Sequence, residues 1–103
     1  MNVMIYQVKR DIDEDNNILF WSFERIKKKI PNIKQQFRDY YDKVYEFTLN
    51  TKYKTDAQAL NDVYNMFNQD HPEDFRGHSL SVSDIVILED RMYLCDSFRW
   101  IEL

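Results

Sequence analysis

The chain is short of the residues that form covalent cross-links, metal sites and flexible loops. Its 103 residues include one cysteine, two histidines, two prolines and one glycine. Because Cys95 is the only thiol, an internal disulfide is excluded, and a closed four-ligand zinc site of the Cys/His type lacks ligands. A single glycine argues against a glycine-rich phosphate loop. We therefore expect neither a metal ion nor another cofactor.

Long hydrophobic runs are missing as well. No apolar stretch approaches the roughly 20 residues that cross a bilayer. The N-terminal residues also lack a basic region followed by an apolar one, the pattern of a secretory signal. These absences predict a cytoplasmic protein that does not contact membranes.

Apolar side chains, by contrast, are abundant. Hydrophobic residues make up 44% of the chain and aromatic residues 16%, which is too much for a disordered chain. A chain of this length buries roughly 65% of the surface that its unfolded form exposes, which is enough for one core. We predict one domain over residues 1–103. The aromatic supply is generous for one small core, so self-association stays open.

Charge is distributed unevenly along the sequence. The formal net charge is -4, yet residues 1–54 hold 11 basic and 8 acidic side chains, whereas residues 55–103 hold 3 basic and 10 acidic ones. The N-terminal half is therefore mildly basic and the C-terminal half strongly acidic. An acidic total makes direct nucleic-acid binding a poor expectation, because that binding depends on a surplus of positive charge.

Short stretches of β-branched and aromatic residues predict the strands. Residues 3–8 form the first strand and residues 43–49, with a period of two, form the second. Residues 85–88 are continuously apolar, which is typical of a central strand, and residues 92–95 return after a turn as its hairpin partner. The C-terminus is expected to dock on the core through four apolar residues, Phe98, Trp100, Ile101 and Leu103.

Apolar residues at intervals of three and four predict the helices. One such stripe covers residues 23–37, and Pro31 divides it into a helix that ends just before the proline and a short helix that begins with it. A third helix is predicted over residues 56–68, because Thr55 and Gln58 form a capping-box pattern in front of it. The order of elements indicates an α+β fold. We expect a small, mainly antiparallel sheet of about four strands, with two or three helices packed on one face and a C-terminal hairpin.

The longest predicted loop covers residues 69–83 and holds the only glycine, Gly77. The sequence around it reads HPEDFRGHSLSVSDIVIL, preceded by YYDKVYEFTL and DVYNMFNQD and followed by YLCDSFRW. These motifs resemble the YodL-like domain of Firmicutes and their plasmids, phages and conjugative elements. The resemblance covers roughly residues 40–100 well and the first 40 loosely, and Arg99 stands where many relatives carry glycine. It implies a mobile-element setting and no agreed catalytic residues.

The loop has a structural and a catalytic interpretation. In the structural one, Gly77 supplies a positive backbone φ, and the short polar side chains up to Asp84 bond nearby backbone amides. In the catalytic one, the chain is a small hydrolase or nuclease-like enzyme that uses His78, Asp84 and Asp96. The structural interpretation is favoured, because short polar side chains favour turns. Nucleophilic catalysis by a serine is also disfavoured, because the chain has no GxSxG elbow. Cys95 is assigned no role.

Protein binding is therefore expected instead of catalysis. The sequence favours a non-enzymatic interaction protein of mobile-element origin that binds and inhibits a host protein. Its most concrete form is an anti-CRISPR protein whose acidic surface occupies the basic nucleic-acid channel of an effector nuclease. The predicted contact residues lie in the loop and elsewhere in the acidic half: Asp70, His71, Glu73, Asp74, Phe75, Arg76, His78, Ser79, Asp84, Asp90 and Asp96.

A further alternative is an accessory domain that binds single-stranded nucleic acid through Tyr40, Tyr41, Tyr45 and the basic residues of the first two helices. The same basic residues also fit a solvated helix face opposite the apolar stripe. They are Arg25, Lys27, Lys28, Lys29, Lys34 and Arg38. The negative total charge favours the solvated face.

Overall fold

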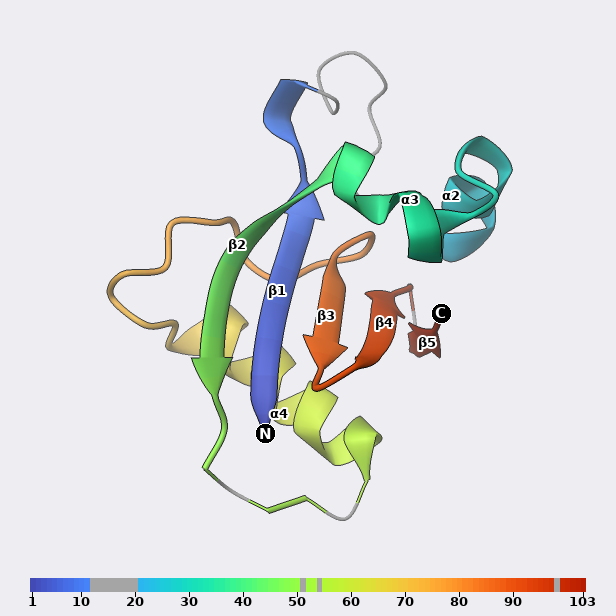
Figure 1. Cartoon of the computed structure of the whole chain (residues 1–103). Coiled ribbons are helices and arrows are strands. Elements are labelled where there is room, and N and C mark those ends of the chain that lie inside the picture. The colour runs from blue at the N-terminus through green and yellow to red at the C-terminus, as the bar shows by residue number, and fades with distance from the viewer. Residues whose placement is uncertain (12–20, 51, 54, 98) are drawn as a thin grey trace.

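The computed structural model describes residues 1–11, 21–50, 52–53, 55–97 and 99–103 (Figure 1). In chain order the elements are β1 (Asn2–Val8), α2 (Phe23–Lys29), α3 (Ile33–Tyr40), β2 (Tyr41–Thr48), α4 (Asp56–Gln69), β3 (Ile85–Leu88), β4 (Arg91–Cys95) and β5 (Trp100–Glu102). None of the described helices is long and apolar enough to cross a membrane.

All five strands join one antiparallel sheet in the order β2-β1-β3-β4-β5. The α+β class and the hairpin of β3 and β4 are therefore confirmed, with one strand more than the four expected. The additional strand is β5, which pairs with β4 and brings the C-terminus onto the sheet, where the N–H of Leu103 donates to the carbonyl of Met92 at 2.9 Å. Of the four apolar residues expected to dock, Phe98 lies outside the described residues.

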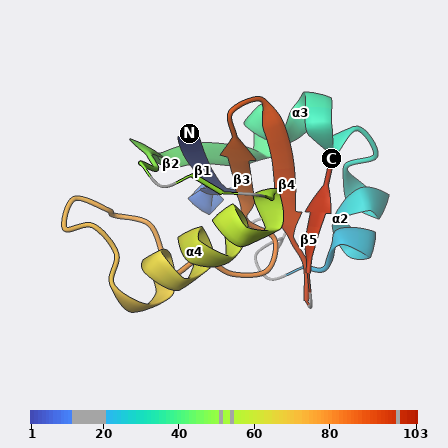
Figure 2. The ribbon, with the colours of Figure 1, turned by 90° about the horizontal axis from the view of Figure 1, so that it is seen from below.

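Helices cover both faces of the sheet, so the expectation of helices on one face was wrong in this detail (Figure 2). Val86 and Leu88 of β3 pack in the core under α4, whereas Ile85 and Ile87 pack in a second core under α2 and α3. The physical reason is the unbroken apolar run of β3. A strand with apolar side chains on both faces needs cover on both.

The helix boundaries follow the predicted signals closely. Pro31 divides α2 from α3 as expected, and the stripe of the two helices buries Ile26, Ile33 and Phe37. The expectation that the second helix begins with Pro31 was wrong, because the first helical hydrogen bond runs from the N–H of Gln36 to the carbonyl of Asn32 and α3 begins at Ile33.

At the start of α4, the hydroxyl of Thr55 accepts a hydrogen bond from the backbone N–H of Gln58 at 3.3 Å, as the capping pattern predicts. The segment after α4 then leads to β3 and packs Phe75 and Leu80 into the core on the α4 face of the sheet, and this placement creates the candidate site.

Candidate functional site at residues 70–84

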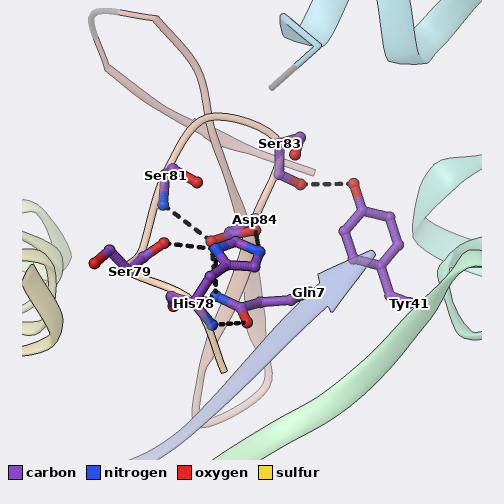
Figure 3. Close-up of polar contacts among 7 residues, drawn as sticks. All are labelled: Gln7, Tyr41, His78, Ser79, Ser81, Ser83 and Asp84. Atoms are coloured by element: carbon purple, nitrogen blue, oxygen red, sulfur yellow. Dashed lines mark hydrogen bonds and ion pairs between the residues drawn. The ribbon is translucent and has the colours of Figure 1, made fainter. Parts of the chain in front are cut away.

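Gln7 of β1 ties the segment after α4 to the sheet (Figure 3). Its amide nitrogen donates to the carbonyl of His78 at 2.9 Å and to Oδ2 of Asp84 at 3.0 Å, and its amide oxygen accepts from the N–H of His78 at 3.2 Å. The side chain is 3% exposed. Sequence reasoning missed Gln7, although a signal was present, because period two places this polar residue on the same face as Val3 and Ile5.

Asp84 is the buried acid of this network. It is 0% exposed, and its Oδ2 accepts from the N–H of Ser81 at 2.9 Å as well as from Gln7. The predicted bonding of Asp84 to a nearby backbone amide is thus confirmed. Among the described residues its Oδ1 has no hydrogen-bond partner. Burial raises the pKa of Asp84 well above its usual value, although the bonds from Ser81 and Gln7 act in the opposite direction.

His78 lies between this buried acid and solvent. Its Nδ1 is 2.7 Å from the carbonyl oxygen of Ser79, and its Nε2 is 3.7 Å from Oδ1 of Asp84. Nε2 of Gln7 also lies 3.3 Å from this Nδ1, but its two hydrogens are directed at the shorter contacts with the His78 carbonyl and with Asp84. Since a carbonyl only accepts, we assign the proton to Nδ1. Nε2 then presents a lone pair to Asp84, and a protonated carboxyl group of Asp84, which its raised pKa favours, would make this contact favourable. Both ring nitrogens therefore face protein atoms.

The three residues of the catalytic interpretation do not form one cluster. His78 and Asp84 lie together, but Oδ1 of Asp96 accepts a hydrogen bond from the backbone N–H of Phe23 at 2.9 Å, at the start of α2. Cys95 is buried, and burial raises the pKa of its thiol to about 12, which makes it a poor nucleophile. In the part of the chain that the structure describes, no group of three acidic, histidine or cysteine side chains is placed to hold a metal ion.

Two backbone positions hold the segment close to the sheet. Gly77 does not have a positive φ, so that prediction was wrong. Glycine is needed there because a Cβ would clash with the amide oxygen of Gln7 and lie 2.8 Å from Cζ of Phe75. The positive φ falls instead on Ser83, at 86°, where the hydroxyl of Tyr41 donates to the Ser83 carbonyl at 2.6 Å. Burial raises the pKa of Tyr41, which therefore stays a hydrogen-bond donor.

Most of the predicted contact residues are exposed, but two are buried and one is half-buried. Phe75 is 5% exposed and Asp84 is 0% exposed, so neither presents its side chain to a partner. Phe75 packs against Phe67 of α4, with ring centroids 4.8 Å apart, because an aromatic side chain in a polar loop gains more from burial than from solvent contact. Asp96 is half-buried, and the exposed members are Asp70, His71, Glu73, Asp74, Arg76, His78, Ser79 and Asp90.

The exposed side of the segment is ordered by local bonds. Asp74 accepts a hydrogen bond from the hydroxyl of Tyr45 at 2.6 Å, which raises the pKa of that tyrosine. Nη1 of Arg76 donates to the carbonyl of Glu73 at 2.6 Å. The loop backbone is thus held by buried contacts toward the sheet and by hydrogen bonds at the surface, and its charged side chains project from this fixed backbone.

The sheet separates the charges of the chain. Residues 21–40, which include α2 and α3, hold six basic and two acidic side chains, whereas residues 55–84, which include α4 and the loop, hold six acidic and one basic. Figure 2 shows α2 and α3 on one side of the sheet and α4 on the other. The uneven charge of the sequence therefore becomes two surfaces of opposite sign.

The tyrosines proposed for nucleic-acid stacking do not form an exposed row. Tyr41 is 2% exposed, and its hydroxyl is bonded to Ser83. Tyr45 packs its ring against Phe67 and Phe75 at centroid distances of 5.7 Å and 5.9 Å. Base stacking needs an open ring face. The nucleic-acid alternative therefore loses Tyr41 from its proposed surface.

The fold and this site define a small α+β domain organised around an anchored polar loop. A family model described as the YodL-like domain matches residues 2–103, and the chain belongs to that family. No curated protein and no solved structure matches the chain.

Proposed function

We propose that this YodL-like domain is a non-enzymatic interaction protein of mobile-element origin, which binds and inhibits a host protein in the cytoplasm. The observation that carries the proposal is the acidic surface, defined here as the exposed carboxylates of α4 and the following loop: Asp62, Asp70, Glu73 and Asp74. A field of one sign speeds and orients association with a partner of the opposite sign.

The anchoring of the loop supports binding. Gln7 and Phe75 fix the loop from beneath, so its carboxylates are held in place before a partner arrives. A surface that is ordered in advance loses less conformational entropy on binding. A long, basic nucleic-acid channel fits such a surface, because it must hold phosphates with lysine and arginine side chains. The specific form of the proposal is therefore an anti-CRISPR protein that fills the channel of an effector nuclease.

The hydrolase alternative has one observation in its favour, the approach of His78 to Asp84 at 3.7 Å. Against it, Nδ1 of His78 is bonded to a backbone carbonyl and Nε2 faces the buried acid. A general base needs a ring nitrogen directed at substrate. Inhibition by binding accounts for the acidic surface and does not require a free ring nitrogen on His78.

The test reverses the charge of the acidic surface. Host proteins are captured from a lysate with the wild-type chain and identified by mass spectrometry. Their affinity for wild type and for the triple variant Asp70→Lys, Glu73→Lys and Asp74→Lys is then measured at low and high salt. The matched control is the variant Glu24→Lys and Asp39→Lys, which reverses exposed acids on α2 and α3.

The triple variant is expected to lose at least tenfold in affinity at low salt, whereas the control variant changes little. For an effector nuclease, wild type slows cleavage of labelled DNA and the triple variant does not. Equal affinity of wild type and triple variant would remove the acidic surface from the proposal. Capture of no host protein would contradict the binding function itself.

A further inference from the structure

A pocket of about 460 Å³ opens where β1 ends and β2 begins, beside the anchored loop. Its volume lies within the range of about 300–1,000 Å³ typical of small-molecule sites. Its polar lining comes from the end of β1, from β2 and from the loop: Gln7, Arg10, Asp42, Arg76 and His78. The acidic surface does not include these side chains, so the pocket calls for a separate explanation.

The lining is basic within an acidic half of the chain. Arg76 is the one basic residue among residues 55–90, and it lines this pocket. Arg10 and His78 border the same space, and Asp42 is the one acid among the lining residues that the structure describes. Both ring nitrogens of His78 already face protein atoms, so the imidazole only borders the space. The two guanidinium groups at the pocket favour an anion with several acceptor oxygens.

Arg76 is held in position by the loop backbone. Its Nη1 donates to the carbonyls of Glu73 and Phe75, at 2.6 Å and 3.4 Å. Within the described ranges of the chain, its Nε and Nη2 groups have no acceptor. A guanidinium anchored through one nitrogen presents its remaining donors in a fixed geometry, which suits phosphate oxygens.

Asp42 adds the opposite chemistry to the pocket. It pairs with Gln7 in the register of β1 and β2, and its side chain is exposed. In the part of the chain that the structure covers, no ion pair or hydrogen bond occupies its carboxylate. A carboxylate beside an anion site accepts hydrogen bonds from ligand hydroxyls. A ligand that has both phosphate and neighbouring hydroxyl groups satisfies the two parts of the pocket.

We propose that this pocket binds the phosphate monoester of a nucleotide, with Arg10 and Arg76 holding the phosphate and Asp42 accepting from the sugar hydroxyls. The phosphate belongs either to a free nucleotide or to the 5′ end of a strand, and both present the same chemistry. The lysines of α2 and α3 are exposed and strongly hydrated, so they attract phosphate weakly and without a fixed geometry.

The test combines calorimetry with amide chemical shifts of the full chain. The probes are AMP, adenosine and a 5′-phosphorylated trinucleotide compared with its 5′-hydroxyl form. AMP or the phosphorylated trinucleotide is expected to bind saturably, with the largest shifts at the amides of Gln7, Gly77 and His78. Adenosine and the 5′-hydroxyl form are expected to bind at least tenfold more weakly, and preference for the trinucleotide over AMP identifies a strand end as the source.

The variants are Arg10→Gln and Asp42→Asn, and Lys28→Gln on α2 is the matched control that also removes one positive charge. Neither variant replaces a residue of the network formed by Gln7, His78 and Asp84. Arg10→Gln is expected to weaken phosphate binding about tenfold, the usual effect of losing a charge-assisted hydrogen bond. Asp42→Asn reduces the preference for the nucleotide over inorganic phosphate.

Three results would overturn the proposal. One is the absence of saturable binding of both phosphorylated probes at millimolar concentration. Another is an equal loss in Arg10→Gln and Lys28→Gln, since that indicates general attraction to positive charge. The third is a set of chemical-shift changes centred on the amides of α2 and α3, which would show that the anion binds at the basic helices instead of in the pocket.

Discussion

The segment at residues 70–84 and the pair of helices α2 and α3 pack on the same sheet by different physics. The helices bury an apolar stripe that includes Ile26, Ile33 and Phe37. The segment is attached through two buried apolar side chains, Phe75 and Leu80, and in addition through the hydrogen bonds of Gln7 and its neighbours. Apolar packing is non-directional, whereas a buried polar network requires every partner in place. The loop is therefore the region in which single polar changes have large local effects.

The largest expected loss of stability comes from removing an apolar side chain that packs α3 on the sheet. Phe37→Ala removes a side chain that is 3% exposed and contacts Tyr6 at a centroid distance of 4.9 Å. The free energy of unfolding should fall by about 3–5 kcal/mol. Denaturant titration measures this loss, and Gln36→Ala on the exposed side of α3 is the control. A loss below about 1 kcal/mol would contradict the assigned packing.

The next largest loss of stability is expected from removing the hydrogen bonds that hold the segment at residues 70–84. Gln7→Leu keeps the volume but leaves Asp84 and the His78 backbone without three of their bonds. A loss of about 2–4 kcal/mol is expected, because buried polar groups are left unsatisfied. Hydrogen exchange should show the amides of residues 78–84 losing protection before those of α3. Uniform loss of protection would mean that the network supports the whole fold equally.

A smaller loss of stability is expected when the space beside Gly77 is filled. Gly77→Ala places a methyl group against the amide oxygen of Gln7 and should cost about 1–3 kcal/mol, as overpacking does. In the background of Gln7→Ala the same change should cost less, since the nearest contact has been removed. A double-mutant cycle measures the coupling. Additive costs would point to a backbone effect in place of the clash.

The pH dependence of stability tests the buried acid. The pKa of Asp84 is raised in the folded state, so the folded chain binds the proton more tightly than the unfolded chain. The contribution to stability is therefore greatest below the unfolded pKa, near 4, and is lost as the pH rises toward the raised folded value. Relative to Asp84→Asn, wild type should lose stability over this window with a slope of at most about 1.4 kcal/mol per pH unit. An identical pH profile for the two proteins would be contrary to this assignment.

The smallest effect concerns the cap of α4. Thr55→Ala removes the hydrogen bond from the N–H of Gln58 and should cost about 1 kcal/mol. Thr55→Ser keeps the hydroxyl and should cost less. Thermal unfolding distinguishes the two variants, and equal stability of Ala and Ser variants would show that the bond contributes nothing.

Residue spacing predicted the elements because their signals are local. Pro31, the capping pattern at Thr55 and the apolar run of β3 each act over a few residues. The cap and the central strand were interpreted correctly, and Pro31 divides the two helices as expected, although α3 begins two residues after it. The two-sided cover of the sheet was missed, although the same apolar run contained the signal. Strand β5 was missed as a strand because three residues are too short for a clear period.

The candidate site was only half visible in the sequence. The loop was recognised as unusual, and its exposed acids were placed correctly on the surface. The role of Gln7 depends on a contact across 71 residues, and the reason for Gly77 depends on that same side chain. No local pattern reports such a contact.

By itself, the sequence determined the fold class, most element boundaries, the family and the presence of two oppositely charged halves. Tertiary structure alone decided which carboxylates are exposed, why the single glycine stands at position 77, and that the charges lie on opposite faces of one sheet. The reason is physical. Helices and strands arise from interactions between near neighbours, whereas burial, close approach and the geometry of a polar network depend on residues that only folding brings together.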